Sequence, residues 1–431
     1  MKKRIIPILL GAVLAASACL MTACGGSSEN EITLVASTST REYIQAVCDA
    51  YNAQNPEVPV RPLYNANQDG FISAKKAPDL IFTNNLDAEN KYHYVLEDLA
   101  PYIEAENFDT SIYYEDVIDS LYTPDGTIRG LPVTCNLSLL YYNKTMFDDY
   151  NEGKAESEKL GYPDETWTLA DFADACEKLT IPSGAGVAQY GAELTDNWWG
   201  EWLIYVRSYG GDFMNEDETD IALDSEAAKQ GFEFMYDLYL SGHATRVPNQ
   251  FSAGEAAMLM GGHVGNWLSY NALEGFEWDV APLPTLNEGE RLATSEITAD
   301  VYGISNTSKH KDAAWDFLKF LTGYEGQKII NDTVSSVSCL KQIGQEKMQT
   351  EKSERPNPQN LEAIYDVQLN YVEPLPTYRY FRTMHDNYVA PCVTRLFEGQ
   401  YASAGSSAAE QVEAMVAEAC ADARNYMRNP S

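Results

Sequence analysis

The chain has 431 residues, with 30 Lys and Arg against 64 Asp and Glu, so its formal net charge is −34. A surface this acidic repels nucleic acid and anionic lipid, which excludes partners of both kinds. The length predicts two domains of ordinary size, and after the N-terminal segment no apolar stretch reaches the roughly 20 residues of a membrane helix.

The first element in the chain is a targeting segment. A positively charged start precedes an apolar run over residues 5–18, which is typical of a signal peptide. The sequence Met-Thr-Ala-Cys that ends at Cys24 resembles a bacterial lipobox, and a Gly- and Ser-rich stretch follows it. This resemblance implies a lipoprotein signal peptide at 1–23, a diacylated Cys24 and a lipidated tether at 24–30, on the extracytoplasmic face of the cell membrane. The alternative is an ordinary cleaved signal with an incidental cysteine.

Polar residues follow the first two predicted strands. A short buried strand at 32–36 runs into Thr38 and Ser39, where Ser39 with Glu42 fits a capping box that begins a helix. A second strand at 78–82 ends in Thr83-Asn84-Asn85. Ligands of open α/β sheets bind at the carboxyl ends of the strands, so we expect the pairs Thr38 and Ser39, and Asn84 and Asn85, to face a cleft. Simple capping and turn roles are the alternative for these residues.

Further strands and helices alternate to the end of the chain. Strands are predicted at 130–133, 139–144 and 278–281, and helices from Thr168 and over 225–241, 313–321 and 407–428, with an exposed connection at 345–360. This alternation predicts an α/β fold with largely parallel sheets. The six cysteines beyond the leader are widely spaced and form no C-x-x-C pair, which predicts buried free thiols and no metal site, with a disulfide as the alternative.

Five motifs in this order resemble bacterial extracellular solute-binding proteins of the maltodextrin-binding type. They are Pro-Asp-Leu-Ile at 78–81, Gly-Leu-Pro at 130–132 with Leu-Tyr-Tyr-Asn-Lys at 140–144, Thr-Trp-Thr at 166–168, Phe-Ser-Ala-Gly-Glu-Ala-Ala-Met at 251–258, and Tyr-Gly-Ile-Ser at 302–305. Each motif alone is weak, but the ordered set spans nearly the whole chain after the leader.

The resemblance implies a two-lobed periplasmic-binding-protein-like fold, in which each lobe is a mostly parallel sheet flanked by helices. The N-terminal lobe is expected at 31–135 plus 285–340 and the C-terminal lobe at 136–284 plus 341–431, with crossings near 135–140, 282–286 and 340–345. The lobes would close on a ligand by hinge bending and deliver it, as a monomer without a cofactor, to the permease of an ATP-binding cassette (ABC) importer.

A sugar site needs aromatic platforms surrounded by amide, carboxylate and hydroxyl groups. Besides the two pairs named above, the resemblance and the position of the crossings favour a further set of ligand contacts. They are Asn136, Asp196, Trp198, Trp199, Trp267, Asp300, Tyr302, Tyr378 and Arg379.

Sugar or oligosaccharide binding without catalysis is the leading interpretation. Few basic residues occur in the candidate loops, which disfavours an anionic ligand, whereas Asp196 and Asp300 leave a cationic ligand such as a polyamine open. The alternative from another class is a secreted carbohydrate-active hydrolase. The chain has no G-x-S-x-G elbow, H-E-x-x-H or P-loop, but 64 acidic residues leave paired catalytic carboxylates possible.

Overall fold

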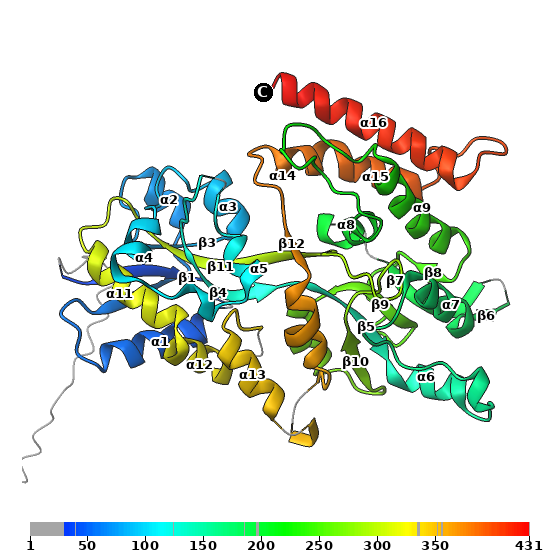
Figure 1. Ribbon diagram of the computed structural model, residues 1–431, viewed down its shortest axis with the longest axis horizontal. Coiled ribbons are helices and arrows are strands. Elements are labelled where there is room, and N and C mark those ends of the chain that lie inside the picture. The colour runs from blue at the N-terminus through cyan, green and yellow to red at the C-terminus, as the bar shows by residue number, and fades with distance from the viewer. Residues whose placement is uncertain are drawn as a thin grey trace, which may run out of the picture.

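The computed structural model describes residues 30–38, 40–123, 125–184, 186–194, 198–333, 337–350, 352–354 and 357–430. These residues form two lobes, each built on an open six-stranded sheet flanked by helices (Figure 1). The predicted two-lobed α/β architecture is therefore confirmed. The leader with Cys24, and the predicted contacts Ser39 and Asp196, lie outside the described residues. Among those described, no helix is long and apolar enough to cross a membrane.

The first lobe contains the sheet with strand order β12-β11-β3-β1-β2, in which β4 also pairs with β11. Its strands are β1 (Ile32–Ala36), β2 (Val60–Tyr64), β3 (Leu80–Asn84), β4 (Leu131–Asn136), β11 (Ser295–Ile304) and β12 (Val372–Pro374). Its helices are α1 (Arg41–Asn52), α2 (Gln68–Ser73), α3 (Asn85–Asn90), α4 (Ala100–Glu106), α5 (Glu115–Asp119), α11 (Lys311–Thr322), α12 (Tyr324–Thr333) and α13 (Lys341–Gln349).

The second lobe contains the sheet with strand order β10-β5-β9-β7-β6, in which β8 pairs with β7. Its strands are β5 (Ser138–Asn143), β6 (Ile181–Ser183), β7 (Gly186–Leu194), β8 (Ala244–Thr245), β9 (Ala256–His263) and β10 (Trp278–Ala281). Its helices are α6 (Lys144–Asn151), α7 (Leu169–Leu179), α8 (Trp199–Ser208), α9 (Glu226–Leu240), α10 (Trp267–Tyr270), α14 (Phe381–Met384), α15 (Ala390–Phe397) and α16 (Ala408–Arg428). Short 3₁₀ turns occur at Thr110–Ile112, Glu156–Glu158, Val264–Asn266, Lys352–Glu354 and Gln368–Asn370, and π-turns at Ala363–Val367 and His385–Val389.

The two sheets are mixed, whereas the sequence predicted mostly parallel ones. Strand β1 pairs in parallel with β2 and β3, and β7 pairs in parallel with β9. Strand β11, however, returns antiparallel to β3 and β4, and β5 runs antiparallel to β9 and β10. The parallel pairs at the centre of the first sheet keep the carboxyl ends of β1, β2 and β3 at one edge.

Side-chain caps fix where several helices begin. The Thr168 hydroxyl accepts from the Asp171 backbone N–H while the Asp171 carboxylate accepts from that of Thr168, which forms a capping box at the start of α7. Ser225 caps α9 in the same way through the N–H of Ala228. These caps place the two helices at the positions that the sequence predicted.

Two early passages of the chain connect the two sheets. Strand β4 ends at Asn136 and β5 begins at Ser138, so the chain enters the second lobe within two residues. The chain returns after β10 and joins the first sheet as β11. Helix α13 still packs against α12, and β12 still pairs with β11, so both elements stay with the first sheet. We therefore propose the third crossing after Pro374 and not near 340–345.

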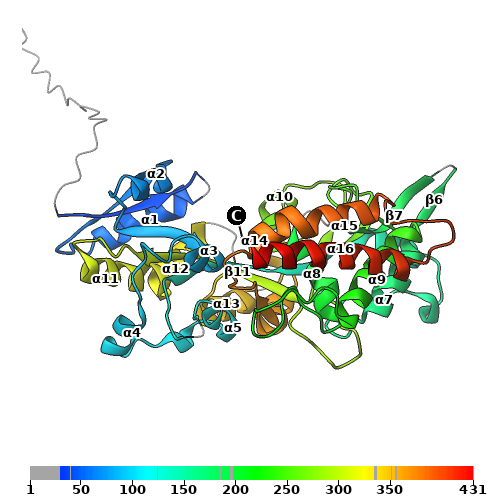
Figure 2. The same ribbon diagram turned by 90° about the horizontal axis from the view of Figure 1, so that it is seen from above.

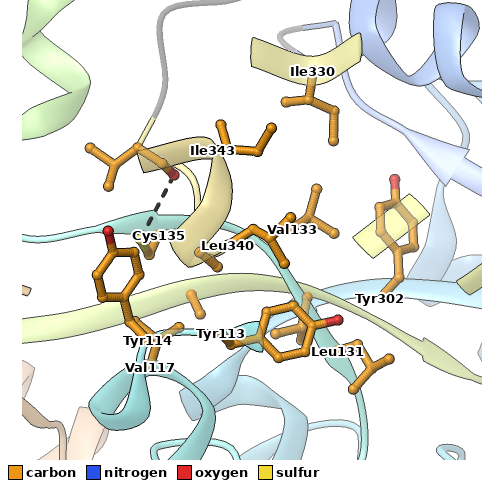
Figure 3. Packing of buried hydrophobic residues seen from close by; sticks show 14 of the residues in the cluster. Tyr113, Tyr114, Val117, Leu131, Val133, Cys135, Tyr302, Ile330, Leu340 and Ile343 are labelled. Carbon is orange, nitrogen blue, oxygen red and sulfur yellow. Dashed lines mark hydrogen bonds between the residues drawn. The ribbon is translucent and has the colours of Figure 1, made fainter. Parts of the chain in front are cut away.

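A continuous apolar core fills the first lobe around the crossing strands (Figure 3). Val133 of β4, Tyr302 of β11 and Ile330 of α12 pack there with Tyr113 and Leu340, and all are at most 3% exposed. The same cluster continues to one face of the second sheet, and a second cluster covers the other face. The lobes are therefore joined at their base by packed side chains as well as by the crossing strands.

The cysteines support one prediction about reactivity. All six in the described part of the chain are buried and free, as predicted: Cys48, Cys135, Cys176, Cys339, Cys392 and Cys420. Burial, followed by the nearby charge of Asp49, raises the pKa of Cys48 to about 12, and the thiolate is the reactive form. We expect native residues 30–431 to resist a thiol reagent for minutes, and the denatured chain to react at six thiols. Fewer than six on denaturation would instead indicate a disulfide.

Candidate ligand cleft between the lobes

A hollow of about 500 Å³ lies at the carboxyl ends of β1, β2 and β3. Its polar lining includes Thr38 after β1, Asn65 after β2, Asn84 at the end of β3, and Asp300 from β11. Phe82 adds an aromatic side chain to the wall. Three of the predicted ligand contacts, Thr38, Asn84 and Asp300, are therefore brought together at the sheet edge where ligands of open α/β sheets bind.

Local hydrogen bonds orient the amides of this hollow. The Thr38 hydroxyl donates to the amide oxygen of Asn65 at 2.8 Å, and the amide oxygen of Asn84 accepts the backbone N–H of Asp87 at 2.8 Å. The Gln68 side chain pairs with both the N–H and the C=O of Phe82, at 3.0 and 2.8 Å. Because the oxygens of Asn65 and Asn84 are engaged, their NH₂ groups remain as donors for a ligand hydroxyl.

Two carboxyl groups supply acceptors in the same hollow. Asp300 accepts a hydrogen bond from the Thr134 hydroxyl at 2.9 Å, and burial raises the pKa of Asp300 above its usual value. Asp87, in the first turn of α3, forms an ion pair at 3.4 Å with Arg382 of α14 in the second lobe. The hollow is therefore polar, with one of its two acids partly neutralised from across the cleft.

Helices α3 and α14 face each other across the space between the lobes (Figures 1 and 2). The Arg382 guanidinium that reaches Asp87 also lies 5.2 Å from the centre of the Trp199 ring. Trp199 is 6% exposed and packs against Phe381 and His385. The Asp87–Arg382 pair therefore connects the two lobes, and Trp199 packs against Arg382 on the side of the second lobe.

Trp198 comes directly before Trp199 at the start of α8, and its indole is half-buried. Its ring centre lies 5.3 Å from that of Trp199 and 5.9 Å from that of His263. The Glu201 carboxylate accepts the Trp198 backbone N–H at 3.2 Å, which fixes the residue at the start of α8. Burial lowers the pKa of His263 to about 4, so its imidazole is neutral at physiological pH. Trp198 with a neutral His263 suits stacking and hydrogen bonding to an uncharged ligand.

Several predicted contacts lie in the interior and not at the cleft. Tyr302 is fully buried and donates to the carbonyl of Val35 at 2.8 Å. Trp267 is 3% exposed and belongs to the aromatic core beneath the second sheet. The Asn85 side chain turns toward β11, donates to Ile297 O at 3.1 Å and accepts Ala299 N–H at 3.2 Å. Their side chains complete the fold, and none of the three lines the hollow.

The remaining predicted contacts lie outside the hollow. Asn136 is half-buried at the first crossing. Tyr378 packs against the second core, and the Arg379 guanidinium lies 4.7 Å from the Tyr380 ring. None of these three lines the hollow.

Sequence reasoning missed several residues of the cleft. Asn65 follows a strand whose apolar pattern is interrupted by Arg61 and Pro62, so the strand was not recognised. Asp87 carries a usable signal, since it lies three residues after the helix cap Asn84. Arg382 has no such signal in the sequence, because its contact with Asp87 joins positions 295 residues apart.

The chain is similar to several known proteins. A model of the family described as "Bacterial extracellular solute-binding protein" matches residues 36–328. An arabinooligosaccharide-binding protein of Halalkalibacterium halodurans is 26% identical over 328 residues, which cover 69% of this chain and 68% of that protein. A maltooligosaccharide ABC transporter solute-binding lipoprotein of Streptococcus pneumoniae is 22% identical, over 76% of this chain and 79% of that protein. A solved ABC substrate-binding protein of Listeria monocytogenes in complex with cycloalternan shares the fold, with a TM-score of 0.72 and 21% identity over 92% of this chain and 99% of that one.

Proposed function

Because the chain belongs to the family of bacterial extracellular solute-binding proteins, we propose that it captures a sugar or oligosaccharide outside the cell and delivers it to the permease of an ABC importer. The lobes close on the ligand and open again at the permease, and no bond is made or broken. The names of the arabinooligosaccharide- and maltooligosaccharide-binding relatives support this ligand class.

One observation carries the proposal. The hollow of the first lobe offers amide, hydroxyl and carboxyl groups, among them Asn65, Asn84 and Asp300. We take the half-buried indole of Trp198, at the start of α8 in the second lobe, as the facing wall. Sugar rings present hydroxyls at their edge and C–H groups on their faces, so a polar wall opposite an indole matches both. Asp87 is paired with Arg382, which makes the cleft less suited to a strongly cationic ligand.

We further propose that Cys24 carries the lipid anchor and is the only contact with the membrane, and that the protein acts as a monomer without a cofactor. The leader motif supports the anchor, as does the lipoprotein named among the relatives. Labelling of growing cells with a fatty-acid probe checks it: the wild-type chain incorporates the label and Cys24→Ala does not. A labelled Cys24→Ala chain would contradict the assignment.

The first experiment is a thermal-melt screen of residues 30–431 against mono- and oligosaccharides, polyamines, amino acids and phosphate. A ligand that binds only the folded state, at 100 times its dissociation constant, stabilises it by about 2.7 kcal/mol. A shift with one sugar class, with the sugar recovered intact, supports the proposal. A shift with polyamines alone would replace the ligand class, and recovery of a cleaved sugar would identify a hydrolase.

A further inference from the structure

One carboxyl group is enclosed where the crossing segments meet. Glu296 on β11 is fully buried, and its backbone pairs in register with Glu373 of β12. The hydroxyl of Ser138, the first residue of β5, lies 3.1 and 3.2 Å from the two carboxyl oxygens of Glu296. The Ser138 N–H donates to Ser295 Oγ at 2.8 Å. The hydrogen bonds of Ser138 to Ser295 and Glu296 therefore connect the first crossing with the second.

The same carboxyl group packs against helix α8 of the second lobe. A Cβ added to Gly200 would lie 2.7 Å from Glu296 Oε2 and 2.3 Å from the Trp198 ring, so the carboxyl and the indole lie close together at this glycine. Farther along α8, the buried Arg207 donates to Glu373 O at 3.1 Å and to Pro374 O at 2.9 Å. Rotation of the lobes about the crossings must shear the contact between Glu296 and α8, because the two belong to different lobes.

The charged groups that face Glu296 do not balance it. Within the described part of the chain, the Arg207 guanidinium on α8 lowers the pKa of Glu296, and it is already paired with Asp212 at 3.2 Å. Glu201 on α8 and Glu373 on β12 add negative charge to the same region. If Glu296 ionised, its negative charge would therefore be buried beside other acids, with one cation shared among them.

We propose that Glu296 is a positioning residue of the hinge, whose neutral carboxyl holds α8 and Trp198 against the crossing strands and whose ionisation favours the open form. This role rests on the proposed function in that Trp198 is taken as a ligand contact. The hinge contact itself is independent of which ligand is bound.

The direction of the pH dependence follows from burial. Burial raises the pKa of Glu296 to about 8, with the Ser138 hydroxyl and Arg207 acting in the opposite sense. Water that reaches the carboxyl in an open form returns its pKa toward the usual value of about 4.3. At a pH between these two pKa values, the closed form therefore keeps a proton that the open form has lost. The preference for the closed form then falls as pH rises, by at most about tenfold per pH unit. Above the closed-form pKa no further loss is expected.

The test uses residues 30–431, which contain every described element. Without any ligand, we expect small-angle scattering to give a larger radius of gyration at pH 9 than at pH 6. The infrared band of a protonated carboxylic acid should disappear over the same range. Affinity for the best sugar of the melt screen should weaken between pH 6 and 9, by at most about 100-fold. In Glu296→Gln the amide stays neutral, so the infrared band should be missing and the other two profiles flat.

Two further variants keep the result interpretable. Glu233→Gln alters a half-buried acid of α9, whose pKa is also raised by burial, away from the hinge, and should leave every profile unchanged. Ser138→Ala removes a hydrogen bond that lowers the Glu296 pKa, so its titration midpoint should move to higher pH, a direction that loss of structure alone does not give. Identical profiles for wild type and Glu296→Gln would overturn the inference. Absence of sugar binding with an intact ligand-free titration would overturn only the proposed function.

Discussion

Replacing Gly231 by alanine is expected to lower the free energy of unfolding of the second lobe by up to about 2 kcal/mol. Gly231 lies where α9 crosses α8, and a Cβ there would stand 2.4 Å from Tyr205 O and 2.6 Å from Val206 Cα. These are backbone atoms that cannot rotate away, so the helices must separate. Overpacking of this kind costs about 1–3 kcal/mol or more, against about 1 kcal/mol gained because alanine favours the helix.

Denaturant unfolding of residues 30–431 measures the effect, with Gly161→Ala as the control. Gly161 has no heavy atom near its ideal Cβ position and no left-handed backbone, so alanine should be tolerated there. Because α8 begins beside Trp198, the Gly231 variant should also bind ligand more weakly. A Gly231→Ala protein as stable as the wild type would show that the α8–α9 contact is looser than described.

Replacing Trp198 by alanine is expected to weaken sugar binding about 10- to 100-fold, which corresponds to about 1.4–2.8 kcal/mol. The half-buried indole lies at the start of α8 and is proposed as the aromatic wall of the site, and a tryptophan at the centre of a binding surface commonly accounts for at least about 2 kcal/mol. Isothermal titration with the best sugar of the melt screen measures the loss. Trp198→Phe keeps an aromatic face and should lie between the wild type and the alanine variant.

Tyr94→Ala is the matched control, because Tyr94 is an aromatic residue that is 62% exposed and does not line the hollow. Its affinity should equal that of the wild type. Unchanged affinity in Trp198→Ala, together with an unchanged thermal midpoint, would remove Trp198 from the site. It would leave the polar wall of the first lobe as the principal binding surface.

The local signals in the sequence predicted much of the fold. The strand at 32–36 and the helix caps Thr168 and Ser225 depend on neighbouring residues, and the structure has each of them. The direction of β11 could not be predicted in this way. Its antiparallel pairing with β3 depends on contacts between distant parts of the chain, which apolar periodicity does not encode.

The candidate site shows the same difference between residues with a signal in the sequence and residues placed by long-range packing. Thr38 and Asn84 could be found because each follows or ends a predicted strand, and Asp300 because it comes just before a motif of the family. Trp267 was placed at the cleft by a family motif, but the turn after β9 directs its ring into the core. Arg382 joins the cleft only through the packing of α14 opposite α3, so no local pattern could identify it.

The late return of the chain to the first sheet also bears on how the protein is made. Strand β11 ends at Ile304 and its parallel neighbour β12 at Pro374, so the first sheet lacks strands until most of the chain has been synthesised. A nascent chain that stops earlier has an unpaired edge at β11 and cannot complete the first core. Such a chain stays incompletely folded for most of its translation, a condition favourable for threading through a translocation channel before folding on the far side.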